Sequence, residues 1–128
     1  MILLDTCVLF WLELGPERIS SKAREAMQAP TAQLFASAIS AFELGLKVRS
    51  SEIALPMPVG KWVREVCERR GIRVLPLDEE AAGLSTMLPL LHRDPCDRFL
   101  IATAQLACLT IVSPDDKICQ YPNLKVIW

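Results

Sequence analysis

The sequence predicts a three-layer α/β/α sandwich, in which helices cover both faces of a central, mainly parallel sheet of about five strands. Short apolar runs alternate along the chain with longer stretches of helical periodicity. The apolar runs lack the polar alternation of half-exposed strands, so they are typical of strands buried on both faces. Parallel strands need crossover connections, which the intervening helices supply. A length of 128 residues suits one domain, and we expect residues 1–128 to form a single unit.

The first half of the chain predicts two strands and three helices. Residues 1–4 are an apolar run, and residues 6–13 predict a helix that a Gly-Pro pair ends. Residues 20–28 predict a second helix with a serine cap. Residues 32–36 predict the second strand. Residues 40–49 then predict a helix that opens with a Ser-x-x-Glu capping box.

The second half continues the alternation. A loop with two prolines leads to residues 59–70, whose apolar side chains recur at helical spacing and which a glycine ends. Residues 73–76 predict a strand, and residues 78–87 a helix capped by an aspartate. Residues 98–109 are nearly apolar all round, which indicates a central, buried helix. The last two strands are predicted at residues 110–112 and 124–128.

The composition indicates a folded protein with no overall excess of positive charge. Hydrophobic residues make up 52% and charged residues 23%, which excludes an intrinsically disordered chain. Fourteen basic and 15 acidic side chains give a net charge of −1, so a nucleic-acid ligand would need a local basic patch. Residues 44–73 carry seven basic and three acidic side chains, 7 − 3 = +4. On charge alone, a solvated helix face is the simpler explanation of that segment.

The cysteines and the N-terminus bear on where the protein works. Five cysteines, odd in number, widely spaced and without a C-x-x-C pair, argue against a disulfide framework and a zinc site. We expect reduced, mostly buried thiols. The apolar N-terminus has no basic leader, so we expect no signal peptide, and no apolar run is long enough to cross a membrane. These features predict a cytoplasmic protein.

Four acids follow the predicted strands or begin the helices after them: Asp5, Glu43, Asp97 and Asp115. Ligands of open α/β sheets bind beyond the carboxyl ends of the strands, so these side chains are expected to converge. Two carboxylates ~5 Å apart repel by about 3 kcal/mol at an effective dielectric near 20. A hard divalent cation removes this penalty, and ligation by oxygen alone favours Mg²⁺ or Mn²⁺ over zinc.

Two of these acids also have an ordinary structural explanation. Glu43 could complete the capping box with Ser40, and Asp97 could follow an N-cap at Asp94. Asp5 has no such explanation in the sequence, because an unpaired charge at the end of a central strand is disfavoured. Together the four positions favour a metal site.

Other chemistry is less well supported. His92 is the only histidine and is predicted to be a loop or interface residue rather than a ligand. Cys7 would need a contact with it to form a nucleophile pair, and the spacing does not predict one. No glycine-rich phosphate loop is present.

Four segments occur together in the order of one family. They are Leu3-Leu4-Asp5-Thr6, Ser40-x-x-Glu43 with Lys47, His92-Arg-Asp-Pro-Cys-Asp-Arg98 with the following Phe-Leu-Ile-Ala, and Ser113-Pro-Asp115 with Tyr121-Pro122. These segments resemble the PIN-domain ribonucleases and, more narrowly, the VapC toxins of type II toxin–antitoxin modules. The resemblance covers essentially the whole chain, and its most specific part begins at His92.

The resemblance implies a Mg²⁺ or Mn²⁺ site with four ligands and a set of supporting residues. The implied ligands and catalytic residues are Asp5, Glu43, Asp97 and Asp115, supported by Thr6, Ser113 and, as a candidate fifth acid, Asp94. Cys7 stands where the subgroup often has histidine or asparagine, which puts a polar role there in doubt. Ser113 stands where threonine is common and keeps a hydroxyl group.

The implied function is hydrolysis of RNA phosphodiester bonds by a metal-activated water, as the toxin of a toxin–antitoxin pair. The implied partners are a second copy of the chain and a cognate antitoxin that lies over the acidic pocket. Candidate antitoxin contacts are the apolar side chains of the first two helices, with burial as the alternative: Phe10, Trp11, Leu12 and Met27. Two other functions stay open, a catalytically silent adaptor that binds RNA or protein and a Mg²⁺-dependent phosphohydrolase of small molecules.

Overall fold

A computed structural model describes residues 1–128 and contains one five-stranded sheet of order β3-β2-β1-β4-β5. All four strand pairings are parallel, which confirms the predicted sheet. The strands are β1 (Ile2–Leu4), β2 (Leu34–Ser37), β3 (Arg73–Leu75), β4 (Thr110–Val112) and β5 (Lys125–Ile127). β1 is the central strand, and the order places β2 and β4 on either side of it.

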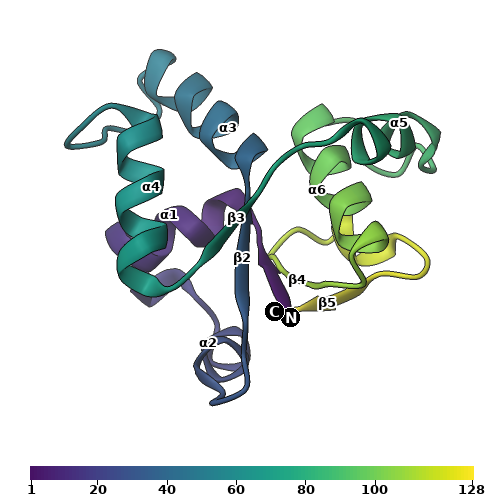
Figure 1. Cartoon of the computed structure of the whole chain (residues 1–128), viewed down its shortest axis with the longest axis horizontal. Coiled ribbons are helices and arrows are strands. Elements are labelled where there is room, and N and C mark those ends of the chain that lie inside the picture. Colours follow the sequence, from purple (N-terminus) through teal and green to yellow (C-terminus); the bar gives the residue numbers. More distant parts are fainter.

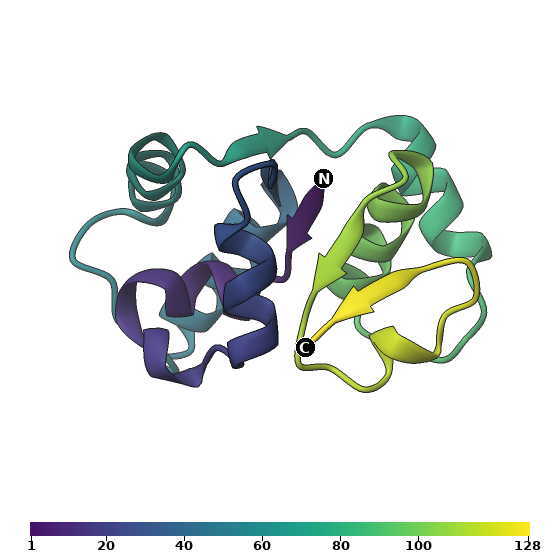
Figure 2. The same ribbon diagram turned by 90° about the horizontal axis from the view of Figure 1, so that it is seen from below.

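Helices cover both faces of the sheet, as the predicted three-layer sandwich requires (Figures 1 and 2). Four helices pack on one side and two on the other. The first group is α1 (Thr6–Leu14), α2 (Ser21–Gln28), α3 (Ala38–Arg49) and α4 (Val59–Arg70). The second group is α5 (Glu79–Met87) and α6 (Pro95–Leu106). The longest helices have 12 residues, so none could cross a bilayer, which takes about 20.

The central strands supply side chains to two separate cores. Ile2 and Leu4 pack into the core beneath α1 to α4, whereas Leu3 between them packs into the core beneath α6. On β4, Val112 packs into the core beneath α1 to α4 and Ile111 packs into the core beneath α6. Alternate residues of a strand point to opposite faces, so a strand covered on both sides must be apolar at every position.

Local signals begin and end several helices at the predicted residues. Ser20 and Asp78 accept hydrogen bonds from the backbone at Ala23 and Ala81, and so cap α2 and α5. Gly71 follows α4 with a left-handed φ of 65°, which glycine adopts without steric cost.

The start of α3 differs from the prediction. The helix begins at Ala38, and the hydroxyl of Ser37 accepts the capping hydrogen bond from the Ile39 amide at 3.2 Å. Ser40 instead lies inside the helix, fully buried. The predicted capping box between Ser40 and Glu43 was therefore wrong, because the chain turns into the helix directly from β2.

Two further boundaries differ. α6 runs from Pro95 to Leu106 rather than over residues 98–109, because Asp94 caps it and the chain turns at Ala107. Short 3-10 turns at Pro16–Arg18 and Ile118–Gln120 were not predicted. Each has a single turn, so it lacks the periodicity that identifies longer helices.

The five cysteines are all free, but the expectation that they are mostly buried was wrong. Cys67 and Cys96 are buried and Cys7 is half-buried. Cys108 and Cys119 are exposed, because they lie in the turn after α6 and in the second 3-10 turn.

The apolar side chains that were predicted as antitoxin contacts are at most partly exposed. Met27 is buried, while Phe10, Trp11 and Leu12 are half-buried against the first core. Burial, the alternative explanation, applies fully to Met27 and in part to the others.

Candidate metal centre

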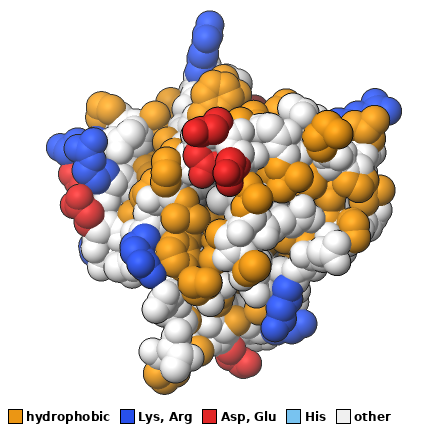
Figure 3. Space-filling model, turned by 45° about the vertical axis from the view of Figure 1, so that its right-hand side comes forward, with side chains coloured by type: hydrophobic (Ala, Val, Ile, Leu, Met, Phe, Trp, Pro, Cys, Tyr) orange, Lys and Arg blue, Asp and Glu red, His pale blue; other side chains and the backbone are white.

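The sheet brings the four predicted acids to one edge. Asp5 follows β1, Asp115 comes three residues after β4, and Glu43 lies on the helix that leaves β2. These strands are parallel neighbours, so their carboxyl ends meet at the same side. Asp97, in the first turn of α6, is close enough for the charges of Asp5 and Glu43 to raise its pKa. The face in Figure 3 carries a compact acidic group among mostly hydrophobic and uncharged side chains.

Asp5 is buried, with 6% of its surface exposed, and all its hydrogen bonds come from neutral groups. One carboxylate oxygen accepts from the Cys7 amide at 3.3 Å, which makes Asp5 the N-cap of α1. The other accepts from the Ser113 hydroxyl. The prediction that Asp5 has no structural role was therefore wrong. No basic side chain forms an ion pair with it, and burial raises its pKa although both donors act to lower it.

Glu43 is half-buried in the middle of α3, where it has no capping role. Burial raises its pKa; a hydrogen bond from Thr6 and the charge of Lys47 oppose this rise, while the charge of Asp5 adds to it. Lys47 also forms an ion pair with Glu52 at 3.6 Å. The charges of other acids therefore act on the Glu43 carboxyl group.

Asp97 and Asp115 meet at His92. The Nε2 atom of His92 forms a hydrogen bond with Asp115 Oδ2 at 3.0 Å and lies 3.0 Å from Asp97 Oδ2. Burial and the charge of Asp5 raise the pKa of Asp97 to about 7, against the opposing effect of His92. Partial burial acts to raise the pKa of Asp115 as well, but hydrogen bonds from His92 and the Lys117 amide outweigh it and lower the value.

His92 is the residue that sequence reasoning underestimated. It does lie in a loop, as predicted, but it is buried, and it contacts two of the acids. Single ligand atoms from His92, Asp97 and Asp115 all lie within 4.8 Å of one another. The signal that could have indicated a role for His92 at this site was its place at the start of the most family-specific segment.

The supporting residues take different roles. The Thr6 and Ser40 hydroxyls are hydrogen bonded to each other at 2.9 Å, and a hydrogen bond from Thr6 opposes the rise in the pKa of Glu43. Ser113 donates to Asp5 and accepts from the Asp115 amide at 3.0 Å, so one hydroxyl joins two of the acids.

The main role of Asp94 is to cap α6. Its carboxylate accepts from the Cys96 amide at 2.8 Å and caps α6, although its charge also raises the pKa values of Glu43 and Asp97. The neighbour of Asp115, Asp116, is exposed.

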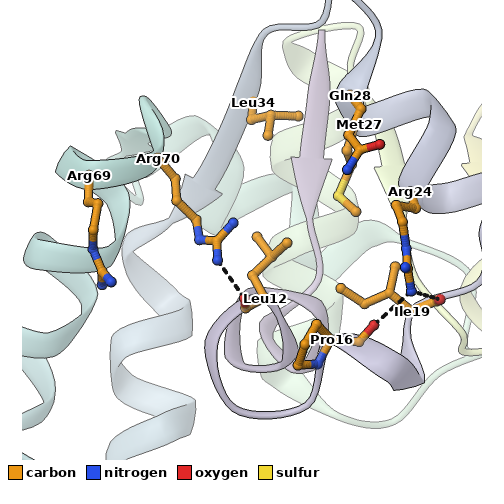
Figure 4. Close-up of a pocket in the computed structure, with 9 residues that line it drawn as sticks. All are labelled: Leu12, Pro16, Ile19, Arg24, Met27, Gln28, Leu34, Arg69 and Arg70. Carbon is orange, nitrogen blue, oxygen red and sulfur yellow. Dashed lines mark hydrogen bonds between the residues drawn. The ribbon is translucent and has the colours of Figure 1, made fainter.

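The largest cavity, of about 540 Å³, lies elsewhere, between α1, α2 and α4 (Figure 4). None of the four acids lines it. The Arg70 guanidinium donates to the Leu12 carbonyl, and Arg24 donates to the carbonyls of Pro16 and Ile19. These cations are already engaged by the protein's own oxygens, so the acidic cluster is the better candidate site.

The fold and the acidic edge define the class of protein. The model of the PIN domain family matches residues 2–124, and the chain belongs to this family. Over 130 residues it is 29% identical to Ribonuclease VapC22 of Mycobacterium tuberculosis, covering 99% of this chain and 98% of that protein.

Solved structures share the fold at lower identity. VapBC2 from Rickettsia felis, crystallised with a DNA fragment from its promoter, superposes with a TM-score of 0.71 at 16% identity, over 98% of this chain and 97% of that one. A toxin–antitoxin complex from Klebsiella pneumoniae gives a TM-score of 0.66 at 19% identity, over 97% and 95%.

Proposed function

We propose that this protein is a metal-dependent endoribonuclease, with residues 1–128 as one PIN-like nuclease domain, and that it is the toxin of a toxin–antitoxin pair. The observation that carries the proposal is the approach of Asp5, Glu43 and Asp97, whose pKa values are raised and none of which forms an ion pair with a lysine or arginine. Membership of the PIN domain family and the likeness to a protein named as a ribonuclease support the same reaction.

The donor set fits a hard divalent cation. Asp5, Glu43, Asp97 and Asp115 would hold Mg²⁺ or Mn²⁺, since they offer carboxylate oxygens, which these ions prefer. Each acid is buried or half-buried, so its neighbours' charges are poorly screened. The bound ion would lower the pKa of a water molecule and neutralise charge on the phosphate.

The chain's own residues prepare this arrangement. The Ser113 hydroxyl fixes one oxygen of Asp5 and, through the Asp115 amide, the loop after β4. Thr6 stabilises the charged form of Glu43. These contacts hold the carboxylates in place before substrate binds, so less ordering is left to the reaction itself.

The basic stretch over residues 44–73 does not form a continuous free patch. Four of its seven basic side chains pair with acids of the protein: Lys47, Lys61, Arg69 and Arg70. This supports the solvated-face explanation for much of that charge. Recognition of RNA would then depend chiefly on the acidic edge and its ion.

Neutral isosteres of the acids test the proposed nuclease. Asp5→Asn, Glu43→Gln and Asp97→Asn should each abolish Mn²⁺-dependent cleavage of RNA and leave the circular dichroism spectrum unchanged. Asp116→Asn, at an exposed acid, is the matched control and should cleave like the wild type. Full activity in any of the three variants would overturn the assignment.

Substrate range separates the alternative functions. Turnover of a nucleotide monophosphate ester without cleavage of RNA would identify a small-molecule phosphohydrolase. Absence of Mn²⁺ binding in calorimetry would favour a silent adaptor. Mapping the 5′ ends of cellular RNAs after expression of the wild type and of Asp5→Asn would locate the cleavage sites.

We further propose a homodimer and a cognate antitoxin as partners, in the cytoplasm, where free thiols such as the five here persist. The large apolar side chains that the structure leaves exposed are the candidate contacts for these partners. They include Phe42 and Leu46 on α3, Met87 at the end of α5 and Leu90 in the loop that follows, with exposures of 58%, 47%, 80% and 86%. A monomeric mass in light scattering at all concentrations would contradict the dimer.

A further inference from the structure

The backbone of His92 is held on both sides by buried groups. Its amide donates to the Tyr121 hydroxyl at 2.9 Å, and its carbonyl accepts from Arg98 Nη1 at 3.2 Å. The Tyr121 hydroxyl also donates to the Pro89 carbonyl at 2.9 Å. The loop between α5 and α6 is thereby fastened at the residue that meets the acids.

Arg98 is 8% exposed and forms no ion pair. Its guanidinium donates to backbone carbonyls at the end of α5 and in the loop that follows. The acceptors are Ser85 at 3.1 Å, Leu88 at 2.9 Å, Pro89 at 3.0 Å and His92 at 3.2 Å. Carbonyls at a helix C-terminus lack helical partners and carry partial negative charge, so a buried cation is stabilised there. This arginine shapes the loop rather than touching the acids.

The ring of His92 has a defined proton position. Its Nδ1 atom accepts a hydrogen bond from the Asp94 amide at 3.1 Å, so the neutral ring carries its proton on Nε2. Nε2 then donates to Asp115 at 3.0 Å, and the same atom lies 3.0 Å from Asp97 Oδ2. A histidine that binds a metal through Nε2 normally donates a hydrogen bond from Nδ1. Here Nδ1 faces a donor, which disfavours that role.

We propose that His92 is a positioning residue: its Nε2–H group holds the Asp97 and Asp115 carboxylates together, and Arg98 and Tyr121 hold His92, so that the ring is not a metal ligand. This inference rests on the proposed metal centre. By distance alone, His92, Asp97 and Asp115 could bind one metal ion together, and this proposal removes His92 from that set of ligands.

The tautomer can be measured directly, because the protein has one histidine. Long-range ¹H–¹⁵N spectra of the metal-free full chain at mildly alkaline pH should show the Nε2–H form. Pulsed electron paramagnetic resonance of the Mn²⁺-loaded protein should show no coupling to a directly bound ¹⁴N nucleus. An Nδ1–H tautomer, or a clear ¹⁴N coupling, would overturn the proposal.

Tyr121→Phe removes the hydroxyl group that bonds the His92 amide and the Pro89 carbonyl, and so tests whether this group positions the loop. Thr103→Val is the matched control, because it removes a buried hydroxyl that bonds the Phe99 carbonyl on the same helix α6 as Arg98. We expect Mn²⁺ affinity in calorimetry to fall about tenfold for Tyr121→Phe and to stay unchanged for the control. His92→Gln, which keeps an N–H donor, should bind Mn²⁺ more tightly than His92→Ala. Equal affinities of Tyr121→Phe and the wild type would contradict the positioning role.

The two proposals fail in different ways. An Nε2–H tautomer in a protein that binds no Mn²⁺ would refute the proposed nuclease function alone. An Nδ1–H tautomer in a protein that binds Mn²⁺ would refute the positioning role alone.

Discussion

Replacing Asp97 with asparagine should stabilise the metal-free protein at alkaline pH. The pKa of Asp97 is raised from 3.8 to about 7 by burial and by the neighbouring acids. In the unfolded chain this carboxyl ionises near its ordinary value, so the folded protein loses stability as the pH rises from about 4 to about 7. Asparagine has a similar shape and no charge, so the variant avoids this loss.

The size of the effect follows from the pKa difference. Between 3.8 and about 7, at 1.36 kcal/mol per pH unit, the ionised carboxylate costs about 4 kcal/mol of folding free energy. The side chain is 17% exposed, and solvent screening there reduces this figure; taking half gives about 2 kcal/mol. For a chain of this length, that corresponds to a rise in Tm of about 6 °C.

Thermal unfolding with a chelator present, at about pH 5 and about pH 8, is the appropriate assay. The gain in Tm of Asp97→Asn over the wild type should be larger at the higher pH. Asp116→Asn removes the same charge from an exposed position and should change Tm little. A gain that is equal at the two pH values, or a loss at the higher one, would refute the electrostatic reasoning.

Three other outcomes are expected. Mn²⁺ at a hundred times its Kd should stabilise the wild type by about 2.7 kcal/mol, and this gain should fall as acid protonates the carboxylates; a gain independent of pH would contradict binding at these groups. Ser37→Ala should lower the free energy of unfolding, measured with denaturant, by about 1 kcal/mol, because α3 loses its cap. Ser40→Ala removes a buried hydroxyl, and the losses of the two variants should add in the double variant. Strong coupling between the two losses would restore the capping-box explanation. A thiol reagent should modify Cys108 and Cys119 quickly in the native protein and the other three cysteines only after unfolding, and rapid loss of all five thiols would contradict the burial of the rest.

Most of the fold could be predicted because its signals are local. The apolar run of β1, the aspartate cap of α5 and the glycine after α4 act over a few residues, and each lies where the sequence placed it. The parallel sheet follows from alternation of such runs with helices long enough to cross over. Single-turn helices and the first residue of α3 escaped prediction, because too few residues carry the pattern.

The sequence indicated the four acids of the candidate site but not their contacts. Asp5 and Ser113 are separated by 108 positions and Thr6 and Ser40 by 34, yet each pair is hydrogen bonded. The residues near Asp5 and Thr6 in the sequence do not specify that Ser113 and Ser40 are their partners.

The sequence by itself determined the helices and strands, the two-sided burial of the sheet and the acidic chemistry at its carboxyl edge, since these depend on the residues present and on their spacing over a turn or two. Only the tertiary structure decided that Asp5 caps a helix, that Glu43 does not, and that His92 lies between Asp97 and Asp115. The physical reason is that these contacts depend on strand register and on the path of the loop fastened by Arg98, and packing sets both across the whole chain.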